Sequence, residues 1–124
     1  MSIKNRIRAF EKKKMALIKK LFEAKVMLRG SFSVAYRKCG KPTCRCARGE
    51  KHPYNRITWS ERAKSKIKTI PSQDVDWAKE LTGNYRIFRK NRQRLRQLEC
   101  DQKLLLDQLE DELVGMARKQ KPYL

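Results

Sequence analysis

The chain has 124 residues, of which 32 are Lys or Arg and 13 are Asp or Glu, so its formal net charge is +19. A chain of this length has room for one small core, and we expect a single domain over residues 1–124. No stretch reaches the ~18 apolar residues of a membrane span, and Lys12, Lys13 and Lys14 interrupt any secretory signal, so the sequence predicts a cytoplasmic protein that is not embedded in a membrane.

The basic charge exceeds what solubility requires and points to a polyanionic partner, most simply RNA or DNA. Residues 1–29 carry 10 basic and 2 acidic groups and residues 30–70 carry 11 and 2, whereas residues 99–124 carry 4 and 6. A basic first helix could alternatively lie on anionic lipid, although the basic excess continues far beyond that helix. The last quarter of the chain presents a different kind of surface.

Apolar residues recur at helical spacing through residues 3 to 29, so the sequence predicts a basic amphipathic helix over residues 1–29. Gly30 stands where a left-handed C-terminal cap is expected, and Arg29 would complement the helix dipole. The candidate phosphate-binding residues of this helix are Lys12, Lys13, Lys14, Lys19 and Lys20.

The hydrophobic period changes to two after Gly30, which predicts a strand over residues 31 to 38. Further strands are predicted over residues 54 to 60 and 65 to 70, with a turn at residues 61 to 64. We therefore expect an α+β fold: a long N-terminal helix, a small three-stranded antiparallel β-meander over residues 30–71 with a Cys/His loop, and a long C-terminal helix with coiled-coil character.

Pro71 should end the sheet, and Ser72 should cap a helix that runs from about residue 73 to 119 within the segment 72–121. Gly83 is expected to mark a bend. A strict spacing of seven predicts a seam that packs on the first helix and on a partner, with residues 99–124 as a docking extension and a homodimer through the long helices as one outcome. The seam residues are Leu81, Phe88, Leu95, Gln102, Leu109 and Met116.

The most specific chemical signal is a C-x4-C-x-C-x5-H pattern in one loop, formed by Cys39, Cys44, Cys46 and His52. Three thiols and one imidazole have the number and kind of donors for a structural, tetrahedral zinc site. The alternatives are ordinary reduced cysteines with His52 as a turn residue, or a fourth ligand other than His52. Cys100 is expected to be a small packed residue and not a ligand.

The segment CGKPTCRCARGEKHPY, residues 39 to 54, resembles a family of small uncharacterised bacterial proteins that are often encoded in or beside transposases and other mobile elements. The resemblance covers roughly residues 28 to 95. It implies a compact cysteine-bearing β-core with flanking helices and an accessory role in mobile-element or defence biology. It implies no established activity.

The chain has one His and no catalytic constellation, so we expect a non-catalytic nucleic-acid-binding protein, RNA or DNA, within a larger nucleoprotein complex. Tyr36, Tyr54 and Trp59 are available to stack on bases, with Trp59 expected in the core and Tyr54 exposed. The remaining candidate contacts are Arg37, Lys38, Lys41, Arg45, Arg48, Lys51 and Arg56 near the loop and Arg86, Arg89, Lys90, Arg92, Arg94 and Arg96 on the second helix.

Two other functions fit the same sequence. The acidic segment 107 to 112 beside apolar residues suits an assembly adaptor whose long helix recruits a larger enzyme such as a transposase, nuclease or polymerase. A redox-sensing thiol protein would instead require metal-free, accessible cysteines in the loop.

Overall fold

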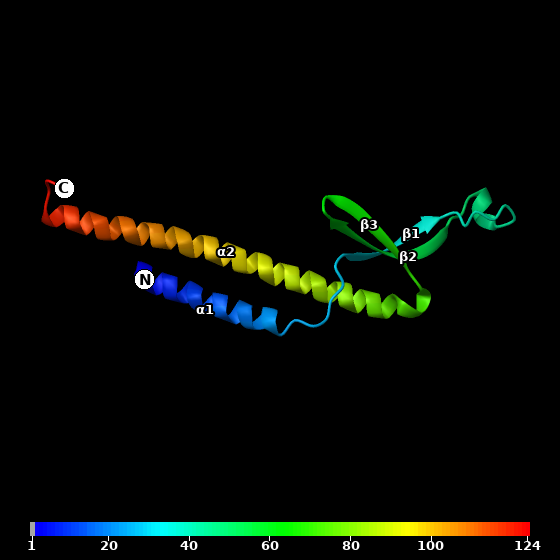
Figure 1. Cartoon of the computed structure of the whole chain (residues 1–124), viewed down its shortest axis with the longest axis horizontal. Helices are drawn as coiled ribbons and strands as arrows, with labels where there is room; N and C mark the ends of the chain where they lie inside the picture. The colour runs from blue at the N-terminus through cyan, green and yellow to red at the C-terminus, as the bar shows by residue number, and fades with distance from the viewer. Residues whose placement is uncertain (1) are drawn as a thin grey trace. The chain divides into compact units, whose positions relative to one another are not determined.

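The computed structural model describes residues 2–124, which form two compact units. The helical unit contains the residues up to Ala24 together with Phe88–Leu124, and the sheet unit contains Lys25–Ile87. The elements are α1 (Ile3–Phe22), β1 (Ser31–Arg37), β2 (His52–Glu61), β3 (Lys64–Ile70) and α2 (Val75–Gln120), with short 3-10 turns η1 (Arg45–Arg48) and η2 (Ser72–Asp74) (Figure 1). The predicted α+β class is confirmed.

The sheet has the order β1-β2-β3 with both pairs antiparallel, which confirms the predicted meander. β1 and β2 run in register from Ser31 opposite Thr58 to Arg37 opposite His52. A two-residue turn joins β2 to β3, and both of its residues have positive φ, 51° at Arg62 and 63° at Ala63. Such angles give the hairpin the twist of its strands, although Gly and Asn adopt them more readily.

One face of the sheet, here called the inner face, carries the core of the sheet unit. Ile57 is buried there beside its cross-strand partner Phe32, and the Lys79 ammonium of α2 lies 5.3 Å from the centre of the Phe32 ring. Ala78, Leu81 and Thr82 on the first turns of α2 are also buried. This small set of side chains holds the sheet against the start of α2.

α1 ends at Phe22 with Glu23 as its C-cap, so the prediction of a helix through residue 29 with Gly30 as its cap is wrong. The following segment is not helical, and α2 provides hydrogen bonds to it: the Leu28 amide donates to the Leu81 carbonyl, and the Asn84 side chain donates to the Val26 carbonyl. These contacts replace the helical bonds that the apolar spacing alone favours.

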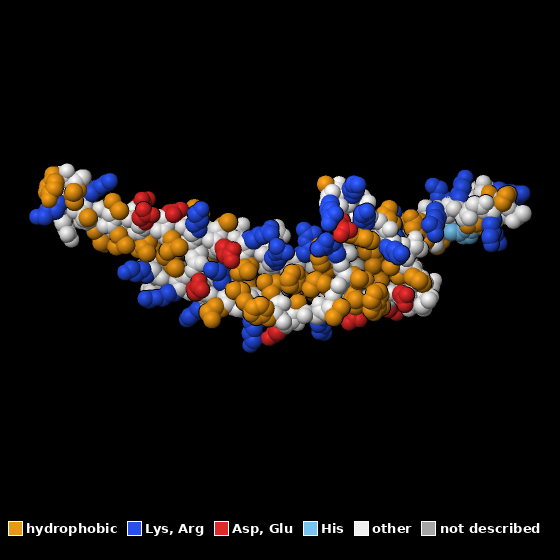
Figure 2. Space-filling view, viewed as in Figure 1, with side chains coloured by type: hydrophobic (Ala, Val, Ile, Leu, Met, Phe, Trp, Pro, Cys, Tyr) orange, Lys and Arg blue, Asp and Glu red, His pale blue; other side chains and the backbone are white. Residues whose placement is uncertain are grey.

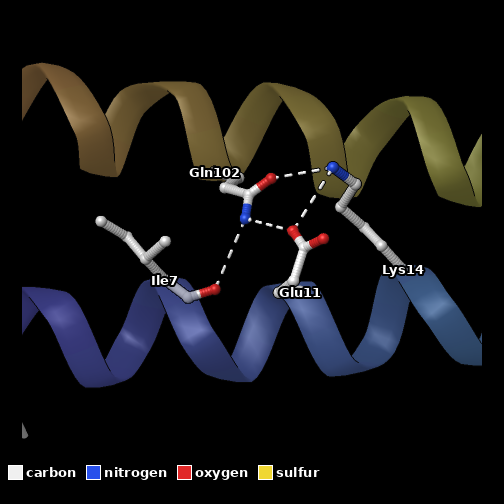
Figure 3. A network of polar contacts seen from close by, with 4 residues as sticks. All are labelled: Ile7, Glu11, Lys14 and Gln102. Atoms are coloured by element: carbon white, nitrogen blue, oxygen red, sulfur yellow. Dashed lines mark hydrogen bonds and ion pairs between the residues drawn. The ribbon is translucent and has the colours of Figure 1, made fainter.

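In the helical unit, α1 and the C-terminal part of α2 lie side by side and run antiparallel (Figure 1). Leu98 and Leu105 of α2 are buried, and the Gln102 side chain between them bonds to Glu11 and Lys14 of α1 (Figure 3). Gln102 belongs to the predicted series with a spacing of seven, whereas the buried Leu98 and Leu105 lie outside that series.

The bounds of α2 lie within two residues of those predicted. Ser72 begins the turn η2, which has no side-chain cap, so its predicted role as the helix N-cap is wrong. Gly83 lies inside the continuous helix. None of the helices in the described part of the chain combines the length and the apolar character needed to span a membrane.

Candidate metal centre and basic surface

The loop between β1 and β2 brings the predicted ligands together through three local features. Cys39 follows the end of β1, and His52 begins β2 opposite Arg37, so the strand pair fixes these two ligands near one another. The Cys44 amide donates to the Lys41 carbonyl at 3.2 Å. The turn η1 then carries Cys46 back toward Cys39.

The four ligand atoms all lie within 4.8 Å of one another, which confirms the predicted cluster. Cys44 Sγ is 2.8 Å from His52 Nε2, and Cys39 Sγ is 3.3 Å from Cys46 Sγ. Donors of a tetrahedral zinc site with Zn–S bonds of ~2.3 Å stand ~3.8 Å apart, so the spread of these distances brackets what a metal ion needs. The side chains can therefore hold a metal ion with small adjustments.

Hydrogen bonds in the loop favour thiolates at two of the three cysteines. The backbone amide of Lys41, with help from the Cys46 thiol, lowers the pKa of Cys39. The backbone amide of Cys46 and the His52 ring lower the pKa of Cys44. The Cys39 amide acts in the same direction on Cys46, but burial and the two neighbouring thiols outweigh it and raise the pKa of Cys46. Metal binding at neutral pH requires these thiolates.

The cluster has a closed side and an open side. Cys46 is only 1% exposed and forms the inner wall, whereas Cys39 and His52 are exposed. Cys100 lies in the helical unit, outside this cluster, and it is exposed, so the expectation that it would be a packed residue is wrong.

The face of the sheet opposite the inner face, here called the outer face, carries Arg37, Tyr54 and Arg56. Alternate residues of a strand point to opposite faces and paired residues share one, so these three side chains lie opposite the face of Ile57. The Arg37 guanidinium stacks 4.3 Å from the centre of the Tyr54 ring. Arg56 donates a 3.2 Å hydrogen bond to Ser33, a residue that the sequence analysis did not single out although the alternation along β1 indicates its face.

The candidate aromatic residues are divided between the two faces. Trp59 shares the inner face with Ile57, as predicted, but it is half-buried and not part of the buried core. Tyr54 is half-buried under Arg37, and Tyr36 is exposed but lies on the inner face, beyond the residues that pack on α2. Tyr54 is thus the single aromatic ring of the three on the outer face.

The outer face continues into the metal cluster. An open pocket of about 440 Å³ connects the two and is lined by Arg37, Lys38, Cys39, His52, Pro53 and Tyr54. Basic side chains surround the pale-blue His52 and the loop in Figure 2. The loop residues Lys41, Arg45, Arg48 and Lys51 are all exposed.

The other candidate contacts lie on the helices. The α2 residues Arg86, Arg89, Lys90, Arg92, Arg94 and Arg96 are exposed, with Arg86 in the sheet unit and the others in the helical unit. Lys12, Lys13, Lys19 and Lys20 of α1 are exposed as well. Lys14 differs, because its ammonium lies between the helices, 3.0 Å from Gln102 and 3.6 Å from Glu11.

The chain belongs to the family of the domain of unknown function DUF6788, whose model matches residues 2–80. The match spans α1, the sheet, the Cys/His loop and the first turns of α2. A comparison with curated proteins and a comparison with solved structures found no match.

Proposed function

We propose that this protein is a non-catalytic, nucleic-acid-binding accessory protein whose sheet unit is stabilised by one structural zinc ion. The observation that carries the proposal is the common face of Arg37, Tyr54 and Arg56, which is continuous with the basic loop around the Cys/His cluster. In this account the outer face and the loop form the nucleic-acid contact.

Zinc suits the donor set and the fold. Three thiolates and an imidazole are common ligands of structural zinc, and four protein ligands leave no open coordination position for an activated water. The core of the sheet unit is small, with Ile57, Ala78, Leu81 and Cys46 as its buried apolar residues. A sheet with so little buried apolar area needs a further source of stability, and a metal ion coordinated by the loop provides it.

The outer face suits single-stranded nucleic acid. Arginines on the face and lysines in the loop neutralise phosphates, and the ring of Tyr54 offers a surface on which a base stacks. The guanidinium of Arg37 already stacks on that ring, and a planar base can take the same place or lie on the guanidinium itself. RNA and DNA share these groups, so the proposal covers both.

The accessory role rests on chemistry and on resemblance. A closed metal site and a phosphate-binding face bind a strand without cleaving it. The loop sequence resembles small proteins encoded with mobile elements, which supports a place in a nucleoprotein complex of mobile-element or defence type.

Matched double variants of the sheet test the proposed face. Arg37→Gln with Arg56→Gln removes two positive charges from the outer face, and Lys66→Gln with Lys68→Gln removes two from the inner face of the same sheet. Fluorescence anisotropy with a labelled single-stranded oligonucleotide should show that the outer pair weakens affinity at least tenfold, about 1.4 kcal/mol, and that the inner pair changes it by less than about threefold.

A second matched pair tests the aromatic contact. Tyr54→Leu should weaken binding by about 1–3 kcal/mol because it removes a stacking surface, whereas Tyr36→Leu on the other face should not. Equal losses from both double variants, or from both tyrosine variants, would contradict the assignment of this face.

A further inference from the structure

The C-terminal part of α2 extends beyond α1 in the helical unit (Figure 1). The Gln102 amide reaches the Ile7 carbonyl at 3.5 Å, and α1 begins at Ile3. Because antiparallel helices have the same rise per residue, the N-terminal end of α1 lies within about two turns of Gln102. α2 continues to Gln120, and none of the helices formed by residues 2–124 lies beside its last turns.

An apolar stripe runs along this extension and continues the face that packs on α1. Its members, Leu106, Leu109, Leu113 and Met116, recur at spacings of three and four and therefore share one side of the helix. They follow Leu98 and Leu105, which are buried. We call these four residues the tail stripe.

Three of the four members of the tail stripe are exposed, and Leu109 is half-buried. Leu106 and Leu113 are each 50% exposed and Met116 is 49% exposed, and hydrophobic side chains are visible along this part of α2 in Figure 2. Apolar side chains in a row at coiled-coil spacing are typical of a helix that packs on another helix. The stripe is therefore suited to pack against another helix.

The charges beside the stripe indicate which helix binds there. The first half of the tail carries the acidic residues Asp107, Glu110, Asp111 and Glu112, and the second half carries the basic residues Arg118, Lys119 and Lys121. A parallel copy would set like charges side by side. An antiparallel copy that crosses near Leu113 sets the acidic half of each tail against the basic half of the other, so the tail is complementary to itself.

We propose that the tail stripe binds a second copy of this chain, and that the two tails pair antiparallel about a two-fold axis near Leu113. In this dimer Glu110 and Glu112, which flank the stripe, face Lys119 and Lys121 of the other copy. Each tail then packs on the same side of the partner's α2 as the partner's own α1 does, but closer to the C-terminal end of that helix. A two-fold arrangement uses one self-complementary surface and forms a closed dimer.

Sedimentation equilibrium of the full-length, nuclease-treated protein tests the proposal. The wild type should approach twice its monomer mass as its concentration rises. Leu113→Glu should raise the dimer dissociation constant at least about 100-fold, because each dimer loses two buried leucines. Val114→Glu is the matched control: it adds the same charge at the next residue, which is 44% exposed and points away from the stripe, and it should dimerise like the wild type.

Cross-linking of the wild type tests the orientation without any substitution. Normal and 15N-labelled protein are mixed, treated with a carbodiimide that joins carboxylates to lysines, and digested. Links between a labelled and an unlabelled chain should join peptides with residues 107 to 112 to peptides with Lys119 or Lys121. If a dimeric sample yields no links of this kind, the antiparallel pairing is overturned.

The other results are equally decisive. A wild type that stays monomeric at all concentrations overturns the proposal, including the case in which the tail binds only a larger protein. A dimer that Leu113→Glu leaves intact, or that both glutamate variants weaken equally, uses a different surface and overturns it as well.

Discussion

The side-chain carbonyl of Gln102 on α2 accepts a hydrogen bond from the Lys14 ammonium of α1 at 3.0 Å (Figure 3). The same Gln102 donates through its amide to Glu11 at 2.9 Å, and Glu11 forms an ion pair with Lys14 at 3.6 Å. One polar residue in an otherwise apolar seam thus contacts two charged residues of the facing helix. A half-buried polar group of this kind favours one register of a helix pair, because any shift leaves its bonds unmade.

Removal of the Gln102 amide should loosen this register. Gln102→Ala should lower the free energy of unfolding by about 1–2 kcal/mol, measured by urea denaturation, because the network loses several hydrogen bonds and leaves a small void. The Gln102 amide first, and Lys14 second, hold the pKa of Glu11 below 4.5, so the network stabilises the fold above that pH and the contribution is lost as pH falls through the folded-state value. Titration of the Glu11 carboxylate by NMR should show a higher pKa in Gln102→Ala, and an unchanged pKa would contradict the network.

Two glycines should respond to alanine in opposite directions. Gly30 has a φ of +124°, and a Cβ there would lie 2.6 Å from the Thr58 carbonyl oxygen, so Gly30→Ala should cost at least about 2 kcal/mol. Gly83 lies in a continuous helix with open space at its Cβ, so Gly83→Ala should stabilise by about 0.5–1 kcal/mol. Thermal melts of both variants measure the contrast, and similar shifts in the same direction would be inconsistent with the backbone described here.

Cys44 lies in the metal cluster and Cys100 lies outside it, so serine variants of the two cysteines form a matched pair. Mass spectrometry under native conditions should find about one zinc ion per wild-type chain, and Cys44→Ser should lose it together with strand signal in circular dichroism. Cys100→Ser should retain both, because Cys100 lies outside the cluster. Since the Lys41 and Cys46 amides lower the pKa values of Cys39 and Cys44, affinity should persist at neutral pH and fall as acid protonates these thiols. An equal zinc content in the two serine variants would contradict the assignment of this cluster as the zinc site.

Much of the sheet unit was predictable because its signals are local. Period-two alternation marked β1, and the C-x4-C-x-C-x5-H spacing marked the cluster, since ligands so close in sequence need only a tight loop to meet. The end of α1 was not predictable, because Val26 and Leu28 obtain their hydrogen bonds from residues of α2 far along the chain. No local pattern reports such a contact.

The turn at Arg62 and Ala63 shows the same limit. Neither residue favours positive φ, yet both adopt it, because the pairing of Glu61 with Lys64 leaves only two residues to reverse the chain. The division of the aromatic residues between two faces was, in contrast, implicit in the strand alternation. What the sequence could not supply was the stacking of Arg37 on Tyr54, which depends on neighbouring strands in register.

The central claim is that this protein binds nucleic acid through phosphate contacts, and the salt dependence of its affinity tests that claim most directly. The dissociation constant of the full-length protein for a labelled single-stranded oligonucleotide is measured over a series of salt concentrations. At least three basic groups in contact with phosphates, each of which displaces ~0.7 counterion, predict a slope of about −2 or steeper for the logarithm of affinity against the logarithm of salt concentration. A flat dependence, or no binding at low salt, would contradict the claim.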